Sequence, residues 1–94
     1  MAYEIIINKR FTNKLLRVLD YLEQEWNPKV ANEFLDKVYV RIYTLQSNPF
    51  IGPPTGILNV RSILITKQNR MFYRVDGNKV IILNLYDTRS DYKK

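Results

Sequence analysis

Residues 66–91 read TKQNRMFYRVDGNKVIILNLYDTRSD, and they carry the strongest strand and turn signals of the chain. Two segments rich in β-branched and aromatic residues, Arg70–Val75 and Lys79–Tyr86, are separated by a short polar run. Either Asp76-Gly77 or Gly77-Asn78 can make the tight turn between them, because both pairs tolerate positive φ. The stretch therefore predicts a β-hairpin of two antiparallel strands.

Both faces of the predicted hairpin carry large apolar side chains. Since successive residues of a strand point to opposite faces, one face is expected to hold Met71, Tyr73, Val75, Val80, Ile82, Asn84 and Tyr86. The other face then holds Arg70, Phe72, Arg74, Ile81, Leu83 and Leu85. Helices are expected to cover the first face, because burying two arginines is costly. The second face is left for the C-terminal tail or for a partner, since monomers rarely expose such a patch without using it.

The N-terminal half predicts one strand and two helices. Tyr3–Ile7 is a short β-branched run that indicates a strand. From Phe11 to Trp26, apolar residues recur at steps of three and four, as on one face of a helix. Asn27 can cap a second helix from Pro28 to about Ser47, and proline suits the first helical position. Two helices joined this tightly predict an antiparallel helical hairpin.

The segment SNPFIGPPTG, residues 47–56, predicts a loop, and Ile57–Thr66 after it predicts a further strand. The predicted fold class is α+β: an N-terminal strand, an antiparallel two-helix hairpin and a three-stranded antiparallel meander, with the helices packed on one sheet face. The 94 residues predict a single domain spanning 1–94. Val40 and Tyr43 point away from the apolar stripe of the second helix and form a second candidate contact surface.

Positive charge is concentrated in the second half of the chain, and the formal net charge is +6. Residues 48–94 hold eight of the 15 Lys and Arg residues but only three of the nine Asp and Glu residues. A one-sided positive field attracts an anionic partner, either nucleic acid or an acidic protein. A basic surface that only aids solubility is the alternative.

The residue types that are missing exclude several chemistries. The chain has no histidine, which removes the usual acid–base residue of metal-independent ribonucleases and every histidine-based triad. It has no cysteine, and the acids of the second half are too few for a two-metal nuclease. No metal or cofactor is therefore expected. Arg, Lys and Tyr remain, and they can grip phosphates and stabilise developing phosphate charge.

Three stretches carry a resemblance to a known group of proteins: NPKVANEFLDKVYVRIYTLQSNPFIG, VRSILITKQNRMFYRVDGNKVIIL and the terminal YDTRSD. In their order and spacing they resemble the RelE/ParE superfamily of bacterial toxins from type II toxin–antitoxin systems. The resemblance covers nearly the whole chain and implies the same α+β fold. It also implies a cognate antitoxin whose acidic, partly disordered tail wraps the toxin and would cover the apolar, cationic face.

The superfamily divides by target, and the resemblance implies different site residues for each branch. RelE-like members cut mRNA on the ribosome with Lys, Arg and Tyr side chains, and ParE-like members inhibit DNA gyrase without that set. The catalytic residues that a RelE-like reading implies here are Arg61, Arg70, Arg89 and Tyr92. A second basic residue expected near Arg61 falls on Ile63, and Tyr92 comes too early, so the ParE-like reading is favoured.

The remaining expectations concern partners. Contacts to nucleic acid or to a protein target are expected from Arg61, Lys67, Arg70, Arg74 and Arg89. Contacts to the antitoxin are expected from Phe72, Ile81, Leu83 and Leu85. The target is gyrase or, in the alternative, the ribosome with its mRNA; an inactive or purely nucleic-acid-binding member is a third reading. No signal peptide or membrane span is recognisable, so a cytoplasmic location is expected. A homodimer is left open.

Overall fold

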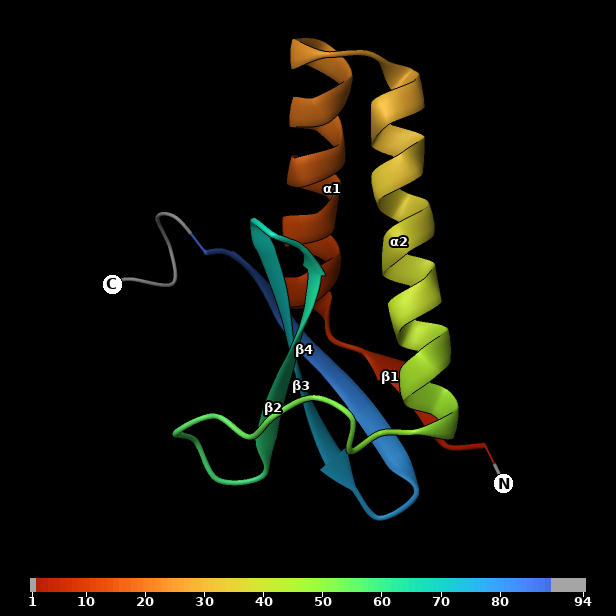
Figure 1. The fold of residues 1–94 in the computed structure, drawn as a ribbon, viewed down its shortest axis with the longest axis vertical. Helices are drawn as coiled ribbons and strands as arrows, with labels where there is room; N and C mark the ends of the chain where they lie inside the picture. The colour runs from red at the N-terminus through yellow and green to blue at the C-terminus, as the bar shows by residue number, and fades with distance from the viewer. Residues whose placement is uncertain (1, 89–94) are drawn as a thin grey trace.

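The computed structural model describes residues 2–88 and confirms the predicted α+β fold. The elements follow one another as β1 (Glu4–Ile7), α1 (Lys9–Glu25), α2 (Pro28–Ser47), β2 (Val60–Thr66), β3 (Asn69–Asp76) and β4 (Lys79–Asp87). They form a helical hairpin on one face of a four-stranded sheet (Figure 1). No helix within residues 2–88 has the length and apolar character that crossing a bilayer requires.

Local sequence signals explain where the helices begin. The Asn8 side chain accepts a hydrogen bond from the Arg10 N–H at 2.9 Å, so α1 starts at Lys9, two residues before the predicted Phe11. The Asn27 side chain accepts from the Val30 N–H at 2.9 Å, and Pro28 occupies the first turn of α2. The prediction for the second helix, Pro28 to Ser47, is confirmed.

The sheet has the strand order β1-β4-β3-β2. β1 runs parallel to β4, and the β2–β3 and β3–β4 pairs are antiparallel. Asp76 pairs with Lys79, so Gly77 and Asn78 form the turn, and Gly77 has a φ of 61°. That value at the first central residue fits a two-residue hairpin turn of type II′.

The start of β2 differs from the prediction, which placed it at Ile57. Residues 57–59 form a turn instead, because the Thr55 hydroxyl accepts from the Ile57 N–H at 3.1 Å and donates to the Val60 carbonyl at 3.0 Å. Asn59 adopts a left-handed conformation with a φ of 64°, which an extended strand does not allow. The strand therefore begins at Val60.

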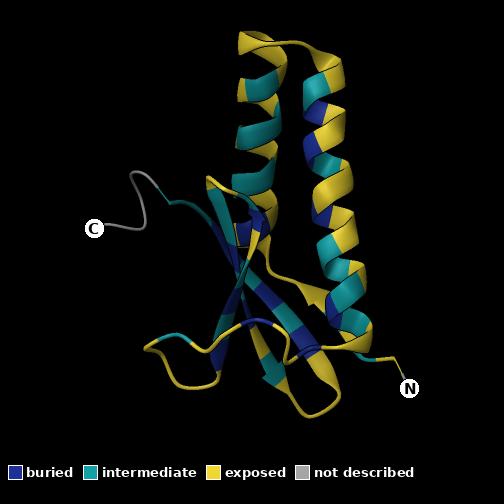
Figure 2. Cartoon of the chain, viewed as in Figure 1, coloured by how far each residue is buried: buried dark blue, intermediate teal, exposed yellow. Residues whose placement is uncertain are grey.

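The core lies between the helical hairpin and the sheet face that Met71 and Tyr73 share (Figure 2). Its buried members come from every helix and from β2, β3 and β4; they are Phe11, Phe34, Val38, Leu45, Ile65, Met71, Tyr73, Val80, Ile82 and Leu85. The opposite sheet face has no helical layer within residues 2–88, as Figure 1 shows. The helices therefore cover the expected face of β3.

A bulge in β4 corrects the predicted faces of its second half. The register shifts between Phe72 and Tyr73, so that Leu85 lies opposite Met71 and is only 2% exposed. Leu85 was predicted on the open face beside Phe72, and it is a core residue instead. Asn84 and Tyr86, predicted on the core face, lie opposite Phe72 and Arg70. One inserted residue reverses the alternation, because side chains repeat along a strand with a period of two.

Candidate binding surfaces

The open sheet face combines aromatic, aliphatic and cationic side chains. The Phe72 and Tyr86 rings meet edge to face with centroids 5.3 Å apart, and the Asn84 side-chain amide donates to the Tyr86 hydroxyl at 3.0 Å. Arg70 Nη1 donates to the Ser62 hydroxyl at 2.7 Å, across the β2–β3 pair. These contacts fix the orientation of the side chains on the open face, which leaves a preformed surface for a partner.

Aliphatic side chains extend the open face in both directions. Leu64 of β2 lies opposite Arg70 and is 39% exposed. Ile81 of β4 lies opposite Arg74 and is half-buried, and Leu83 at the bulge is also half-buried. Arg74 is exposed. We define the open face by the described residues Leu64, Arg70, Phe72, Arg74, Ile81 and Tyr86.

Arg61 does not belong to the open face, although it was predicted to act together with Arg70 and Arg74. It lies directly opposite Tyr73, a core residue, so its side chain is on the helix-side face. Arg61 Nη1 donates to the Gly52 carbonyl at 2.7 Å and to the Phe50 carbonyl at 3.3 Å. The guanidinium also lies 5.1 Å from the centroid of the Phe50 ring, a cation–π contact. Arg61 therefore holds the loop that precedes β2.

Tyr73 holds the same loop from inside the core. Its hydroxyl donates to the Pro49 carbonyl at 2.7 Å and accepts from the Gly52 N–H at 3.0 Å. Burial raises the pKa of the Tyr73 hydroxyl above its ordinary value, while the hydrogen bond with Gly52 and the charge of Arg61 oppose that rise. A side chain at Gly52 would place its Cβ 2.5 Å from the Ser62 carbonyl oxygen and 2.7 Å from the Tyr73 hydroxyl. Only glycine fits at this position.

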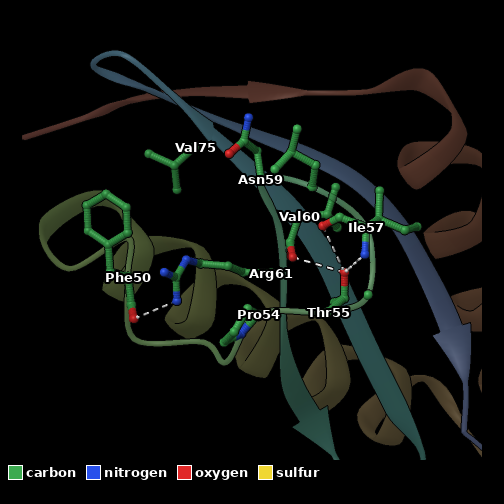
Figure 3. Close-up of a pocket in the computed structure, with 10 residues that line it drawn as sticks. Phe50, Pro54, Thr55, Ile57, Asn59, Val60, Arg61 and Val75 are labelled. Atoms are coloured by element: carbon green, nitrogen blue, oxygen red, sulfur yellow. Dashed lines mark hydrogen bonds between the residues drawn. The ribbon is translucent and has the colours of Figure 1, made fainter.

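The loop that precedes β2 and β2 itself line a solvent-open pocket of about 470 Å³ (Figure 3). Its lining is largely apolar, with Arg61 on one wall; it includes Phe50, Pro54, Ile57, Leu58, Arg61 and Val75. Phe50, Ile57 and Leu58 are exposed. This largely apolar pocket was not predicted from the sequence, because it depends on tertiary contacts between the loop carbonyls and the side chains of Arg61 and Tyr73.

A larger groove, of about 1030 Å³, runs between the helical hairpin and the β2–β3 turn. Its apolar lining includes Val18, Leu22, Phe34 and Leu85. Its charged lining includes Lys14, Arg17, Glu33, Lys37, Lys67 and Asp87. Lys14 Nζ lies 3.4 Å from the Leu85 carbonyl oxygen and 4.5 Å from the centroid of the Tyr86 ring. The positive balance of the lining suits an acidic partner.

The predicted site residues therefore divide among separate surfaces. Arg70, Phe72, Arg74 and Ile81 lie on the open face, Lys67 and Leu85 line the groove, and Arg61 anchors the loop. Ile63 packs against the core from opposite Met71. Arg89 and Tyr92 lie outside the described residues. Within residues 2–88, no three Asp, Glu, His or Cys side chains gather closely enough to hold a metal ion.

Comparison with known proteins gives one family and a consistent set of folds. A family model described as "ParE toxin of type II toxin-antitoxin system, parDE" matches residues 5–92. A chain of the chromosomal ParDE system from P. aeruginosa is similar, with a TM-score of 0.79 and 18% identity over 92% of this chain and 96% of that chain. No curated protein sequence matches.

Two further structures come from toxin–antitoxin complexes of E. coli. The DinJ-YafQ complex contains a chain with a TM-score of 0.66 and 7% identity, over 98% of this chain and 99% of that chain. The intact RelBE complex contains one with a TM-score of 0.62 and 14% identity, over 92% of this chain and 96% of that chain. At such identities the likeness concerns the fold alone.

Proposed function

The chain belongs to the ParE toxin family of type II toxin–antitoxin systems, and we propose that it stops growth by binding a protein target, DNA gyrase, without cutting RNA. In this proposal a cognate antitoxin neutralises the toxin by covering its binding surfaces. Both events take place in the cytoplasm, where gyrase acts on DNA.

The position of Arg61 carries the proposal. An RNA-cleaving site built from the sequence-derived set needs Arg61 beside Arg70, so that both guanidiniums reach one phosphate. The two side chains lie on opposite faces of the sheet, because Arg61 is opposite Tyr73 and Arg70 is opposite Leu64. The Arg61 guanidinium is also bound to two loop carbonyls. Because the Arg61 and Arg70 guanidiniums cannot reach the same phosphate, their arrangement favours binding to a target over cleavage of RNA.

Ile63 supports the same conclusion. The residue stands where a second basic side chain is expected in RNA-cleaving relatives, and it packs against the core. Among the catalytic candidates within residues 2–88, only Arg70 remains on the open face. A single arginine can position an anion, but the nucleophile activation that RNA cleavage requires needs a further group.

Cleavage of mRNA on the ribosome is the second candidate, and the Arg70–Ser62 contact favours it. The 2.7 Å bond fixes the guanidinium on the open face, and exposed Arg74 lies on the same face four residues further along β3. Two arginines in that arrangement can hold a phosphate backbone. If this activity is real, Arg70→Ala lowers the cleavage rate about 10²–10³-fold, because charge stabilisation in the transition state is lost.

The proposed antitoxin segment is acidic and lies across the open face. Phe72 and Ile81 of the open face and Leu83 at the adjacent bulge supply apolar contacts, while Arg70 and Arg74 meet its carboxylates. Leu85 is removed from this set because it belongs to the core. Apolar burial should supply most of the affinity, since exposed ion pairs contribute only about 0–1 kcal/mol each. The arginines mainly speed association and set orientation.

Induced expression of the chain in bacteria separates these readings. The proposal predicts growth arrest with induction of the DNA-damage response and with intact transcripts by primer extension. New 5′ ends within translated mRNA, without DNA damage, would support cleavage of mRNA on the ribosome instead. Unimpaired growth at full expression would favour an inactive or purely nucleic-acid-binding member.

A further inference from the structure

The two edge strands of the sheet, β2 and β1, differ in whether their outward-facing backbone groups are covered. At the β2 edge, Arg41 Nε of α2 donates to the Leu64 carbonyl at 2.8 Å, and the Ser62 N–H donates to the Pro53 carbonyl at 3.2 Å. A bridge between Pro54 and Arg61 covers the same edge. These contacts occupy the groups through which another strand would pair, so the β2 edge is closed to a partner strand.

The β1 edge has no such cover. The Glu4 N–H donates to the Asn78 carbonyl and the Asn8 N–H to the Ile82 carbonyl, each at 2.9 Å. Alternate residues of a parallel strand bond to the same side, so Ile5 and Ile7 present their N–H and C=O groups away from β4. Within residues 2–88, no turn, loop or helix cap forms a backbone hydrogen bond with Ile5 or Ile7.

The side chains of β1 add to this open edge. Ile6 is 36% exposed and Ile7 is 49% exposed, and Figure 2 shows most of the strand coloured as exposed. Glu4 is the only charged residue of the strand. Edge strands usually avoid pairing through inward-pointing charges, proline or bulges, and residues 5–7 contain none of these. The edge is therefore competent to pair with another strand.

We propose that the β1 edge pairs with the β1 edge of a second copy of this chain, in an antiparallel arrangement centred on Ile6. Ile5 of one copy then lies opposite Ile7 of the other, and their N–H and C=O groups form two hydrogen-bonded pairs. Ile6 faces its own symmetry mate in a non-hydrogen-bonded pair. The edge matches itself under a two-fold rotation, as an isologous dimer requires.

The outer surface of α2 supplies further contact area. The Tyr3 N–H donates to the Gln46 carbonyl at 2.8 Å, so the C-terminal end of α2 lies against the start of β1. Tyr39 and Tyr43 share a helical stripe with Gln46, at spacings of four and three residues. Tyr43 is 77% exposed, and Tyr39 is exposed as well. These tyrosines are placed to bring the two α2 helices together, because a four-residue strand alone buries less than the roughly 800 Å² per partner of a stable interface.

Charge distinguishes a second copy from an acidic antitoxin segment as the occupant. In the antiparallel register Glu4 lies opposite Asn8 of the second copy, next to that copy's Lys9. An acidic strand would place carboxylates beside Glu4, and like charges on neighbouring strands are unfavourable. The basic open face and groove suit an acidic segment better, which leaves the β1 edge for self-association.

Disulfide trapping tests the register directly, because the chain has no cysteine of its own. Non-hydrogen-bonded partners lie about 4.5 Å apart at Cα, within the range of a disulfide. Ile6→Cys should therefore cross-link two copies rapidly under mild oxidation. Ile7→Cys should not, because residue 7 faces residue 5 of the other copy. Leu16→Cys, an exposed position on α1, measures random collision.

Sedimentation of the unmodified chain completes the test. The proposal predicts a concentration-dependent mass approaching twice 11.2 kDa. Ile6→Lys should raise the dimer dissociation constant about tenfold or more, because two like charges meet at the symmetry axis, whereas Leu16→Lys should leave it unchanged. A monomer at high concentration, or equal cross-linking at positions 6, 7 and 16, would overturn the proposal. Protection of the Ile5 and Ile7 amides from hydrogen exchange only in an antitoxin complex would also overturn it, by assigning the edge to the antitoxin.

Discussion

Arg61 and Tyr73 stand opposite each other on β2 and β3, and together they bind both backbone polar groups of Gly52. Arg61 Nη1 donates to the Gly52 carbonyl at 2.7 Å, and the Tyr73 hydroxyl accepts from the Gly52 N–H at 3.0 Å. The residue that the sequence marks as a catalytic candidate and a core tyrosine thus share one structural task. This clamp fixes the Pro-rich loop against the sheet and forms the pocket shown in Figure 3.

Tyr73→Phe removes the hydroxyl from the clamp. The Gly52 N–H and the Pro49 carbonyl then lose their partner inside the fold, and each unpaired buried group costs about 1–3 kcal/mol. The expected decrease in the free energy of unfolding is about 2–4 kcal/mol, measured by urea denaturation. Tyr21→Phe, at an exposed position on α1, is the matched control and should change stability by less than about 0.5 kcal/mol. Equal stabilities of the two variants would contradict the clamp.

Gly52→Ala tests the close approach of the loop to β2 and β3. The added Cβ meets the Ser62 carbonyl oxygen at 2.5 Å, and that oxygen belongs to the strand backbone. The loop must move, and overpacking of this kind costs about 1–3 kcal/mol of stability. Gly56→Ala, four residues further along the same loop, has no atom within 4 Å of its Cβ and should be nearly neutral. Thermal unfolding of both variants gives the comparison.

The buried Tyr73 hydroxyl predicts a pH dependence of stability. Its pKa in the folded protein is raised above the ordinary value of 10.0, so the unfolded chain loses this proton at lower pH than the folded chain. The contribution of the protonated Tyr73 hydroxyl to the free energy of unfolding is therefore fully present below about pH 10. It decreases as the pH rises from there through the raised pKa. The slope from this group reaches at most about 1.4 kcal/mol per pH unit. The difference in stability between wild type and Tyr73→Phe, measured at each pH, isolates the contribution of this hydroxyl. Parallel stability curves for the two proteins above pH 10 would contradict it.

Leu64→Ala tests the open face as the antitoxin surface. Leu64 is 39% exposed in the free chain, and burial of a leucine on binding contributes about 1.5–3 kcal/mol. The antitoxin dissociation constant should therefore rise about tenfold or more, as titration calorimetry can measure. Leu16→Ala removes a comparable exposed leucine from the outer surface of α1 and should leave the affinity unchanged. An unchanged affinity for Leu64→Ala, in a protein that melts like wild type, would remove Leu64 from the interface.

Most of the secondary structure was predictable from the sequence, because it depends on local signals. Asn27 and Pro28 define the start of α2, and Gly77 gives the hairpin turn. The bulge in β4 was not predictable, because nothing in the apolar pattern marks an inserted residue. Strict alternation therefore assigned Leu85 to the wrong face. In the structure, Asn84 Oδ1 accepts from the Leu85 N–H at 2.9 Å beside the bulge, a side-chain contact that no apolar pattern indicates.

The site was less predictable than the fold for a related reason. Arg61 and Arg70 carry the same charge, and the strand register alone decides that they lie on opposite faces. The partners of Arg61 come from a loop nine and eleven residues earlier in the chain, and their position depends on the tertiary fold. The groove between the helices and the β2–β3 turn likewise assembles residues from distant segments.

DNA supercoiling by purified gyrase, measured in the presence of the purified chain, distinguishes binding of the target from cleavage of RNA. The account predicts that supercoiling stops as the chain approaches a stoichiometric amount and that added antitoxin restores it. Arg70→Ala should retain most of this inhibition, because no catalytic step depends on the guanidinium. Full supercoiling at a large excess of folded chain, together with cleavage of translated mRNA that Arg70→Ala abolishes, would contradict the account.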